Sequence, residues 1–259
     1  MRMTIITGIL LLVVLMGGCS QTDMMKTLAP SVDQQVATRY IDLLRHHQFD
    51  QIETDLDSSL QTPDIHAALV RLAAAFPAQD PVSVKLVGAN TFHSPSVDKK
   101  NISFEYQFPD RWLLVSVATQ GSGGIRKIYG LHVKVLSDSL ENINRFTLSG
   151  KGVSQYAALA LGTIALIFTL YALVVCIRTR IAKRKWLWII FILVGFGKLS
   201  VNWTTGQWGF MPASIQLFSS SAAAQLYGPW IVAVSFPLGA LWFLLRRKHL
   251  IASAVGDVN

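Results

Sequence analysis

The chain has 259 residues, of which 51% are hydrophobic and 15% charged, and its formal net charge is +8. Residues 20–150 hold 12 Lys/Arg against 14 Asp/Glu, a net charge of −2, whereas residues 151–259 hold 10 Lys/Arg against one acid, a net charge of +9. The basic excess therefore belongs to the apolar second half, and the first half has no basic patch for a phosphate backbone. This distribution argues against nucleic-acid binding and predicts membrane lipid as a partner.

The amino terminus, residues 1–19, is predicted to be a lipoprotein-type signal peptide. A basic residue precedes an apolar run that ends at Met16, and two glycines stand before Cys19, as in a secretory signal with a cleavage site. The ending resembles the bacterial lipobox, in which Cys19 would be acylated and become the first mature residue. It departs from that motif at Met16, where leucine is usual. The alternative is an uncleaved signal anchor, and both place the following residues outside the cytoplasm.

Residues 32–148 are predicted to form an extracytoplasmic α+β domain, joined to the signal by a polar tether, residues 20–31. Apolar residues recur at helical spacing from Asp33, a candidate N-cap, to about His47, and two further helical segments follow before residue 77. From residue 82 the period changes to two, in four runs separated by short turns. This order predicts an antiparallel meander whose apolar face is covered by the helices.

The order of elements resembles the NTF2-like superfamily. The resemblance rests on residues 47–52 after the first helix, on Trp112 early in one strand and on Gly130-Leu131 in the next, and it covers about residues 32–136. It implies a cone-shaped fold with a curved sheet and a pocket between helices and sheet. Since that superfamily contains isomerase-type enzymes and non-catalytic binding domains, the resemblance settles no activity.

A polar cluster near the end of the first helix is the densest group of candidate ligands. It contains His46, His47, Asp42 and Asp50. Asp42 and His46 are four residues apart and could share a helix face as a surface pair or as two metal ligands. A solvated helix end is the preferred interpretation, so no metal site is predicted.

Acid/base catalysis is not the preferred interpretation either. An NTF2-like enzyme would need an acid or base directed into the cone, but Glu105 and His132 alternate with the apolar residues of their strands and should face water. The cysteines, Cys19 and Cys176, lie in unrelated segments, which predicts neither a disulfide nor a zinc site. No catalytic or cofactor-binding residue is therefore predicted, and no cofactor is expected.

The second half is predicted to be an all-α unit of three transmembrane helices. The first span, residues 156–177, has no charged residue and would rise about 33 Å, enough for a hydrocarbon core of about 30 Å. The basic run that follows it marks the cytoplasmic side. The same rule then predicts a cytoplasmic loop, 178–185, a second span, 186–201, an uncharged outer loop, 202–227, a third span, 228–245, and a cytoplasmic tail, 246–259. Lys198, near the outer end of the second span, is interpreted as snorkelling to the headgroups.

These features together predict a multi-pass protein of the bacterial cytoplasmic (inner) membrane that displays a binding domain outside the cytoplasm. The ligand would be a small apolar molecule in the cone or an envelope protein on the sheet. Two alternatives stay open: an acid/base enzyme of the same fold acting on a lipid or small molecule, and an accessory subunit of an envelope transport or assembly complex. The sequence is also compatible with a homo-oligomer.

Overall fold

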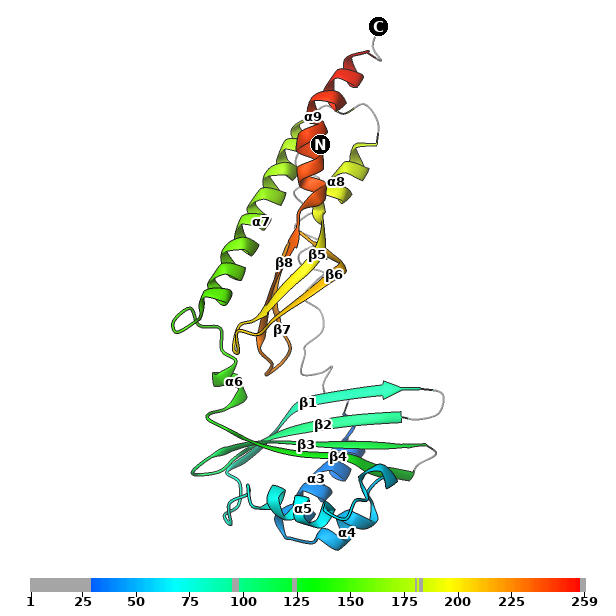
Figure 1. The fold of residues 1–259 in the computed structure, drawn as a ribbon, viewed down its shortest axis with the longest axis vertical. Helices are drawn as coiled ribbons and strands as arrows, with labels where there is room; N and C mark the ends of the chain where they lie inside the picture. The colour runs from blue at the N-terminus through cyan, green and yellow to red at the C-terminus, as the bar shows by residue number, and fades with distance from the viewer. Residues whose placement is uncertain (1–28, 95–97, 123–124, 180, 182–183, 257–259) are drawn as a thin grey trace. The chain divides into compact units, whose positions relative to one another are not determined.

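The computed structural model describes most of the chain after the amino terminus (Figure 1): residues 29–94, 98–122, 125–179, 181 and 184–256. The predicted signal peptide, Cys19 and most of the tether lie outside these ranges and stay predictions. The described residues divide into a first unit that ends at Leu140 and a second unit that begins at Glu141. The sequence placed this boundary near residue 148. However, the Phe146 ring stacks on Trp203 with centroids 4.7 Å apart, so this stretch belongs to the second unit.

The first unit contains a four-stranded antiparallel sheet with its strands in consecutive order: β1 (Ser83–His93), β2 (Asp98–Gln107), β3 (Trp112–Ser122) and β4 (Ile125–Leu136). This is the meander that a period of two predicts. Phe104, Val115 and Val133 stand opposite one another across three strands. Such rows gather the apolar positions on one face of the sheet.

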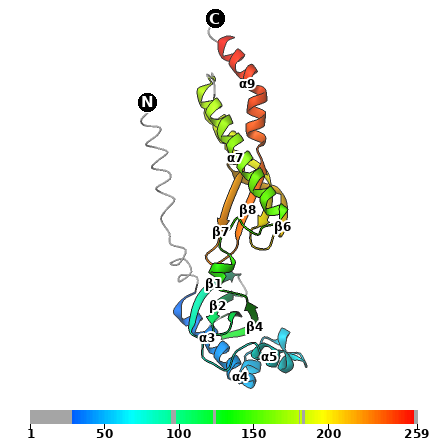
Figure 2. The ribbon, with the colours of Figure 1, turned by 90° about the vertical axis from the view of Figure 1, so that its left-hand side faces the viewer.

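Helices cover that apolar face (Figures 1 and 2): α3 (Ser31–Arg45), α4 (Phe49–Thr54) and α5 (Ile65–Ala73), with the short 3-10 helix η1 (Ser58–Leu60) between them. The N-cap of α3 is Pro30, whereas Asp33 lies in its first turn. The buried Asp33 carboxylate pairs with Lys100 on β2 and with Arg126 on β4, where Nη1 lies 2.6 Å from Oδ1. The residue expected to cap the helix therefore ties it to the sheet.

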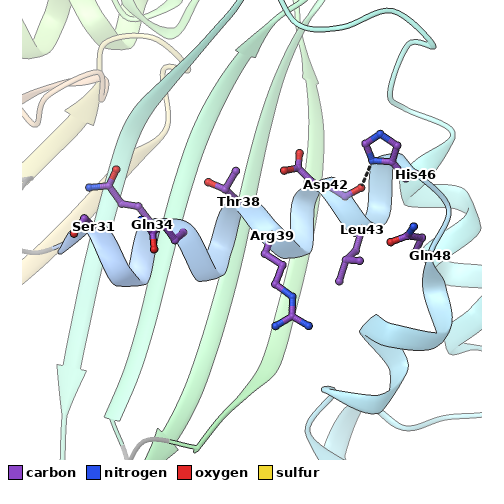
Figure 3. A pocket seen from close by; sticks show the side chains of 9 residues that line it. Ser31, Gln34, Thr38, Arg39, Asp42, Leu43, His46 and Gln48 are labelled. Carbon is purple, nitrogen blue, oxygen red and sulfur yellow. Dashed lines mark hydrogen bonds between the residues drawn. The ribbon is translucent and has the colours of Figure 1, made fainter.

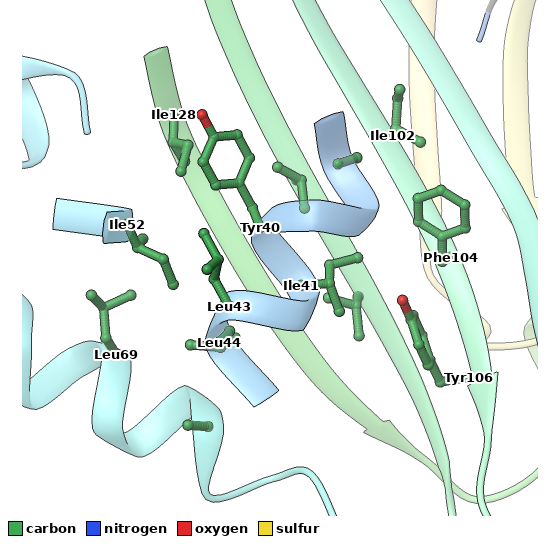
Figure 4. Close-up of a cluster of buried hydrophobic side chains, with 14 of the residues drawn as sticks. Tyr40, Ile41, Leu43, Leu44, Ile52, Leu69, Ile102, Phe104, Tyr106 and Ile128 are labelled. Atoms are coloured by element: carbon green, nitrogen blue, oxygen red, sulfur yellow. The ribbon is translucent and has the colours of Figure 1, made fainter. Parts of the chain in front are cut away.

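Packed side chains fill the space between these helices and the sheet (Figure 4). Ile41, Leu44, Ile52 and Ile128 are all fully buried there. The NTF2-like resemblance implies a ligand pocket at this place. Among the described residues, packed hydrophobic side chains occupy this space, and the ligand pocket stays a prediction.

The second unit combines helices with a second antiparallel sheet, whose strand order is β6-β5-β8-β7. Its elements are α6 (Leu140–Ile143, at the boundary), α7 (Val153–Arg178), α8 (Lys185–Leu193), β5 (Val194–Asn202), β6 (Trp208–Leu217), β7 (Ser220–Ala224), β8 (Trp230–Phe236) and α9 (Leu238–Gly256). Small buried residues on α7, among them Ala158, Gly162 and Ala165, let it lie close to the strands. A Cβ atom on Gly162 would stand only 3.7 Å from the Ser220 Cβ.

The prediction of an all-α unit with three transmembrane helices is wrong. Among the described helices, α7 alone is long and apolar enough to cross a membrane. The predicted second span, 186–201, begins as α8 and continues as β5, and the third, 228–245, begins as β8 and becomes α9 only afterwards. The predicted outer loop, 202–227, contains β6 and β7.

The physical reason is that short apolar runs fit a buried strand as well as part of a span. The nine residues of α8 rise only about 14 Å, too little to cross a bilayer. β5 pairs with β6 on one side and with β8 on the other. Its backbone groups are therefore satisfied laterally rather than within a helix.

Candidate functional site

A groove of about 830 Å³ runs along the outer side of α3 (Figure 3). We call it the α3 groove, and it is lined by Ser31, Gln34, Gln35, Thr38, Arg39, Asp42, Leu43, His46 and Gln48. Thr38 and Asp42 project to one side of the helix and Arg39 and Leu43 to the other (Figure 3). Nearly all the lining side chains are polar.

Several polar side chains of the α3 groove have no partner among the described residues. The Gln34 amide donates to the Ala29 carbonyl oxygen at 2.7 Å. In contrast, the side chains of Gln35, Thr38 and Gln48 make no hydrogen bond within the described part of the chain. These donors and acceptors are free to bind a polar ligand.

The predicted histidine–aspartate cluster is only partly assembled. His46 lies on the groove with Nδ1 2.7 Å from the Asp42 carbonyl oxygen, while the His47 ring stands edge-on to Phe49 with centroids 5.5 Å apart. No group of three His, Cys, Asp or Glu among the described residues could hold a metal ion. His46 is the C-cap residue of α3 and is available to a ligand in the groove.

The α3 groove has a rigid base because α3 is fastened to the structure behind it. The Arg45 guanidinium lies 3.0 Å from the Asp80 carboxylate. The Tyr40 hydroxyl donates to Asp55 Oδ2 at 3.0 Å. Burial, together with the hydrogen bond to Asp55, raises the pKa of Tyr40 to about 12. The hydroxyl thus stays neutral and hydrogen-bonded across the physiological range.

Glu105 is not exposed to water, contrary to the expectation from its strand. It is only 5% exposed, and its Oε2 accepts the Leu140 N–H at 2.5 Å, where α6 begins. Period-two alternation assigns Glu105 to the side of the sheet opposite the core but does not say what covers that side. The carboxylate fastens the chain that leaves the sheet, and the exposed His132 is not joined to it.

In the second unit, α7 exposes large apolar side chains outside its contact with the sheet. Between 47% and 62% of the surface of each of these residues is exposed: Leu161, Ile164, Ile167, Tyr171 and Val174. Leu161 and Ile164 lie next to the strands, and the others lie farther round the helix. No charged residue lies between Lys151 and Arg178. Contiguous apolar surface of this kind marks a site of membrane or protein contact.

Basic residues gather where α7 ends. Arg178 is its last residue, and the Lys185 ammonium donates to the Ile177 carbonyl oxygen at 2.6 Å. In α9, the Arg246 guanidinium stands 5.2 Å from the centre of the Trp242 ring. Cations at a helix carboxyl end complement its dipole. Next to an apolar helix they also match the headgroup region of a bilayer.

A second groove, of about 470 Å³, lies in the second unit between α7 and the strands. We call it the α7 groove. Its lining is apolar except for Lys198 and Ser235, and comprises Leu161, Ile164, Ala165 and Phe168 of α7 together with 196–199, Phe210 and 234–237. This groove is not predicted from the sequence, because its walls come from segments that the three-span prediction assigned to separate spans and to the outer loop.

The fold and these surfaces define the class of protein: two α+β units, one with a polar groove and the other with an apolar helix and an apolar groove. Comparison with known proteins adds no closer assignment, since no family model, curated protein or solved structure matches the chain. The resemblances to the NTF2-like superfamily and to the lipobox therefore stay predictions.

Proposed function

We propose that α7 attaches this protein to a membrane and that the first unit is a binding domain on the extracytoplasmic side. The observation that carries the proposal is the apolar outward side of α7. Its 26 residues extend about 39 Å, more than the roughly 30 Å of a hydrocarbon core. In water this surface would be costly, whereas in lipid its burial is favourable.

The charges at the ends of α7 support this orientation. Lys and Arg adjoining a membrane helix favour the cytoplasmic side. The basic residues Arg178, Arg184 and Lys185 follow the apolar segment, and the first unit precedes it. This arrangement leaves the carboxyl end of α7 inside and the first unit outside. The predicted signal peptide requires the same orientation.

Lipid contacts the outward side of α7 rather than surrounding the helix. The other side packs against the second sheet, in which β6 and β7 are the edge strands. The sheet therefore shields that side of α7 from the lipid.

The α3 groove supports a binding role for the first unit. Its unpartnered amide and hydroxyl groups and the Arg39 guanidinium suit a polar segment of a partner protein. Among the described residues that line the groove, Leu43 alone is apolar. A photo-crosslinking residue at Gln35 should therefore give a discrete adduct in cells, while the same residue at Ser83, an exposed position on β1, should not.

Substituted cysteines test the attachment and the orientation together, in a chain with Cys176→Ala. Labelling is compared with that of the same chain without an added cysteine, which retains Cys19. Ile167→Cys should resist a water-soluble maleimide and react with a bilayer-soluble one. Val82→Cys, in the first unit, should react with an impermeant maleimide while the cytoplasmic membrane is intact. Arg184→Cys should react only after permeabilisation. Water-phase labelling at Ile167, or labelling at Arg184 through an intact membrane, contradicts the proposal.

A further inference from the structure

The α7 groove has the size and lining of a site for a lipid chain. Its volume of about 470 Å³ lies within the range of roughly 300–1,000 Å³ typical of small-molecule sites. Two of its aromatic lining residues, Phe196 on β5 and Phe236 on β8, are paired across the two strands. Such a lining binds apolar groups by removing them from water rather than by hydrogen bonds.

A bulge in β5 shapes the wall of this groove. The pairing of β5 with β8 shifts between Phe196 and Leu199, and the pairing with β6 shifts between Phe196 and Lys198. Gly197 lies in this irregular stretch with φ +69°, a conformation that favours glycine. Bulges re-aim the neighbouring side chains of a strand. The irregular backbone of β5 therefore lies in the part of the strand that lines the groove.

Lys198 gives the α7 groove its single charge among the described lining residues. It is also the only charged residue in the whole stretch 186–245. No described residue forms an ion pair or hydrogen bond with its ammonium group. An unpaired cation beside an apolar surface favours an anionic partner.

We propose that the α7 groove binds one acyl chain of an anionic phospholipid, with the phosphate next to Lys198. This inference rests on the membrane attachment proposed above, which supplies phospholipid as the available occupant. The groove follows α7 from Leu161 to Phe168, about 10 Å along the helix axis. That length and volume fit part of one chain, and the rest of the lipid's hydrocarbon stays in the bilayer.

Two isoleucines on α7 provide a matched test. Ile164 lines the groove and is 62% exposed, whereas Ile167 is 61% exposed and lies outside the lining. Native mass spectrometry of the full chain after mild extraction should show one retained phospholipid. Ile164→Trp fills the groove and should abolish this retention. Ile167→Trp adds the same side chain on the outward side and should leave it unchanged.

The charge is tested with Lys198→Gln in nanodiscs that contain zwitterionic and anionic phospholipid in equal amounts. The unmodified chain should retain the anionic lipid preferentially. The substitution should lower that preference about fivefold, the effect of one basic residue near lipid phosphate. An unchanged preference would show that Lys198 does not face the headgroup and would overturn this part of the proposal.

The proposal is overturned if Ile164→Trp and Ile167→Trp retain the same amount of lipid, because the bound lipid would then be a general coat. Retention of a free fatty acid instead of a phospholipid, or of no lipid, also overturns it. These outcomes are independent of the membrane attachment, which is measured by cysteine labelling at Ile167. If lipid is retained but Ile167→Cys reacts with the water-soluble maleimide, the proposed function is refuted instead.

Discussion

The two sheets of this protein share antiparallel pairing but are covered in different ways. The first has one apolar face, which three helices close into a core, and a buried carboxylate fastens the main helix to two strands. The second lies against α7 through small residues, and its edge strand β6 exposes Trp208, Phe210 and Ile215. The contrast shows that the first unit gathers its apolar side chains in a core, whereas the second leaves many of them exposed at its surface.

Removing the charge of Asp33 should have the largest effect, and it acts only on the first sheet. Asp33→Asn leaves the Lys100 ammonium and the Arg126 guanidinium without their shared partner next to the core. Breaking such a buried pair costs about 3 kcal/mol of unfolding free energy. Pulse proteolysis in urea measures the loss.

Asp42→Asn serves as the control for this substitution. The Asp42 side chain is half exposed and lies 3.7 Å from Arg45, so its loss should change the stability by about 0.5 kcal/mol or less. Equal effects of the two substitutions would mean that α3 is not fastened through Asp33.

The second sheet should be most sensitive to a single added methyl group. A Cβ atom on Gly195 would stand 2.8 Å from both Ser219 Oγ and Ser235 Cβ. Gly195→Ala should therefore cost about 1–3 kcal/mol through overpacking. Gly162→Ala is the control, because its Cβ atom would lie 3.7 Å from the nearest atom and alanine favours the helix. Thermal inactivation in detergent should rank them in this order, and a harmless Gly195→Ala contradicts the close approach.

The Tyr40–Asp55 hydrogen bond should give the first unit an alkaline limit. Because the pKa of Tyr40 is raised from 10.0 to about 12 in the folded state, its contribution is complete below pH 10 and is lost as the pH rises through about 12. Tyr40→Phe should cost about 1 kcal/mol at neutral pH. The difference from the unmodified chain should shrink between pH 10 and 12 in unfolding curves. A constant difference over that interval contradicts the assignment.

The smallest expected effect is a stabilisation at the end of α3. His47 has φ +57°, its N–H donates to the Leu44 carbonyl oxygen, and the Gln48 N–H donates to that of Leu43, which is the Schellman arrangement that favours glycine. His47→Gly should raise the unfolding free energy by about 0.5–1 kcal/mol. His46→Gly, at φ −91°, should give no gain, and a gain at both positions would point to a cause other than the left-handed backbone.

The sequence by itself determined those elements whose hydrophobic pattern is compatible with only one type of secondary structure. The alternation in Ile102–Phe108 requires a half-buried strand, and the uncharged stretch before Arg178 requires a long apolar helix. It also assigned the excess positive charge to the second half. These features depend on local pattern and composition, which are present before any tertiary contact forms.

Tertiary structure decided the rest. Residues 186–201 and 228–245 are apolar enough for helices, but lateral hydrogen bonds make the end of the first range strand β5 and the beginning of the second strand β8. The burial of Glu105 depends on Leu140, 35 residues later, and the α7 groove joins segments up to 76 residues apart, from Leu161 to Pro237. The hydrophobic period of a segment indicates which of its positions share a face. Only long-range contacts decide what covers that face, because their partners are distant in the chain.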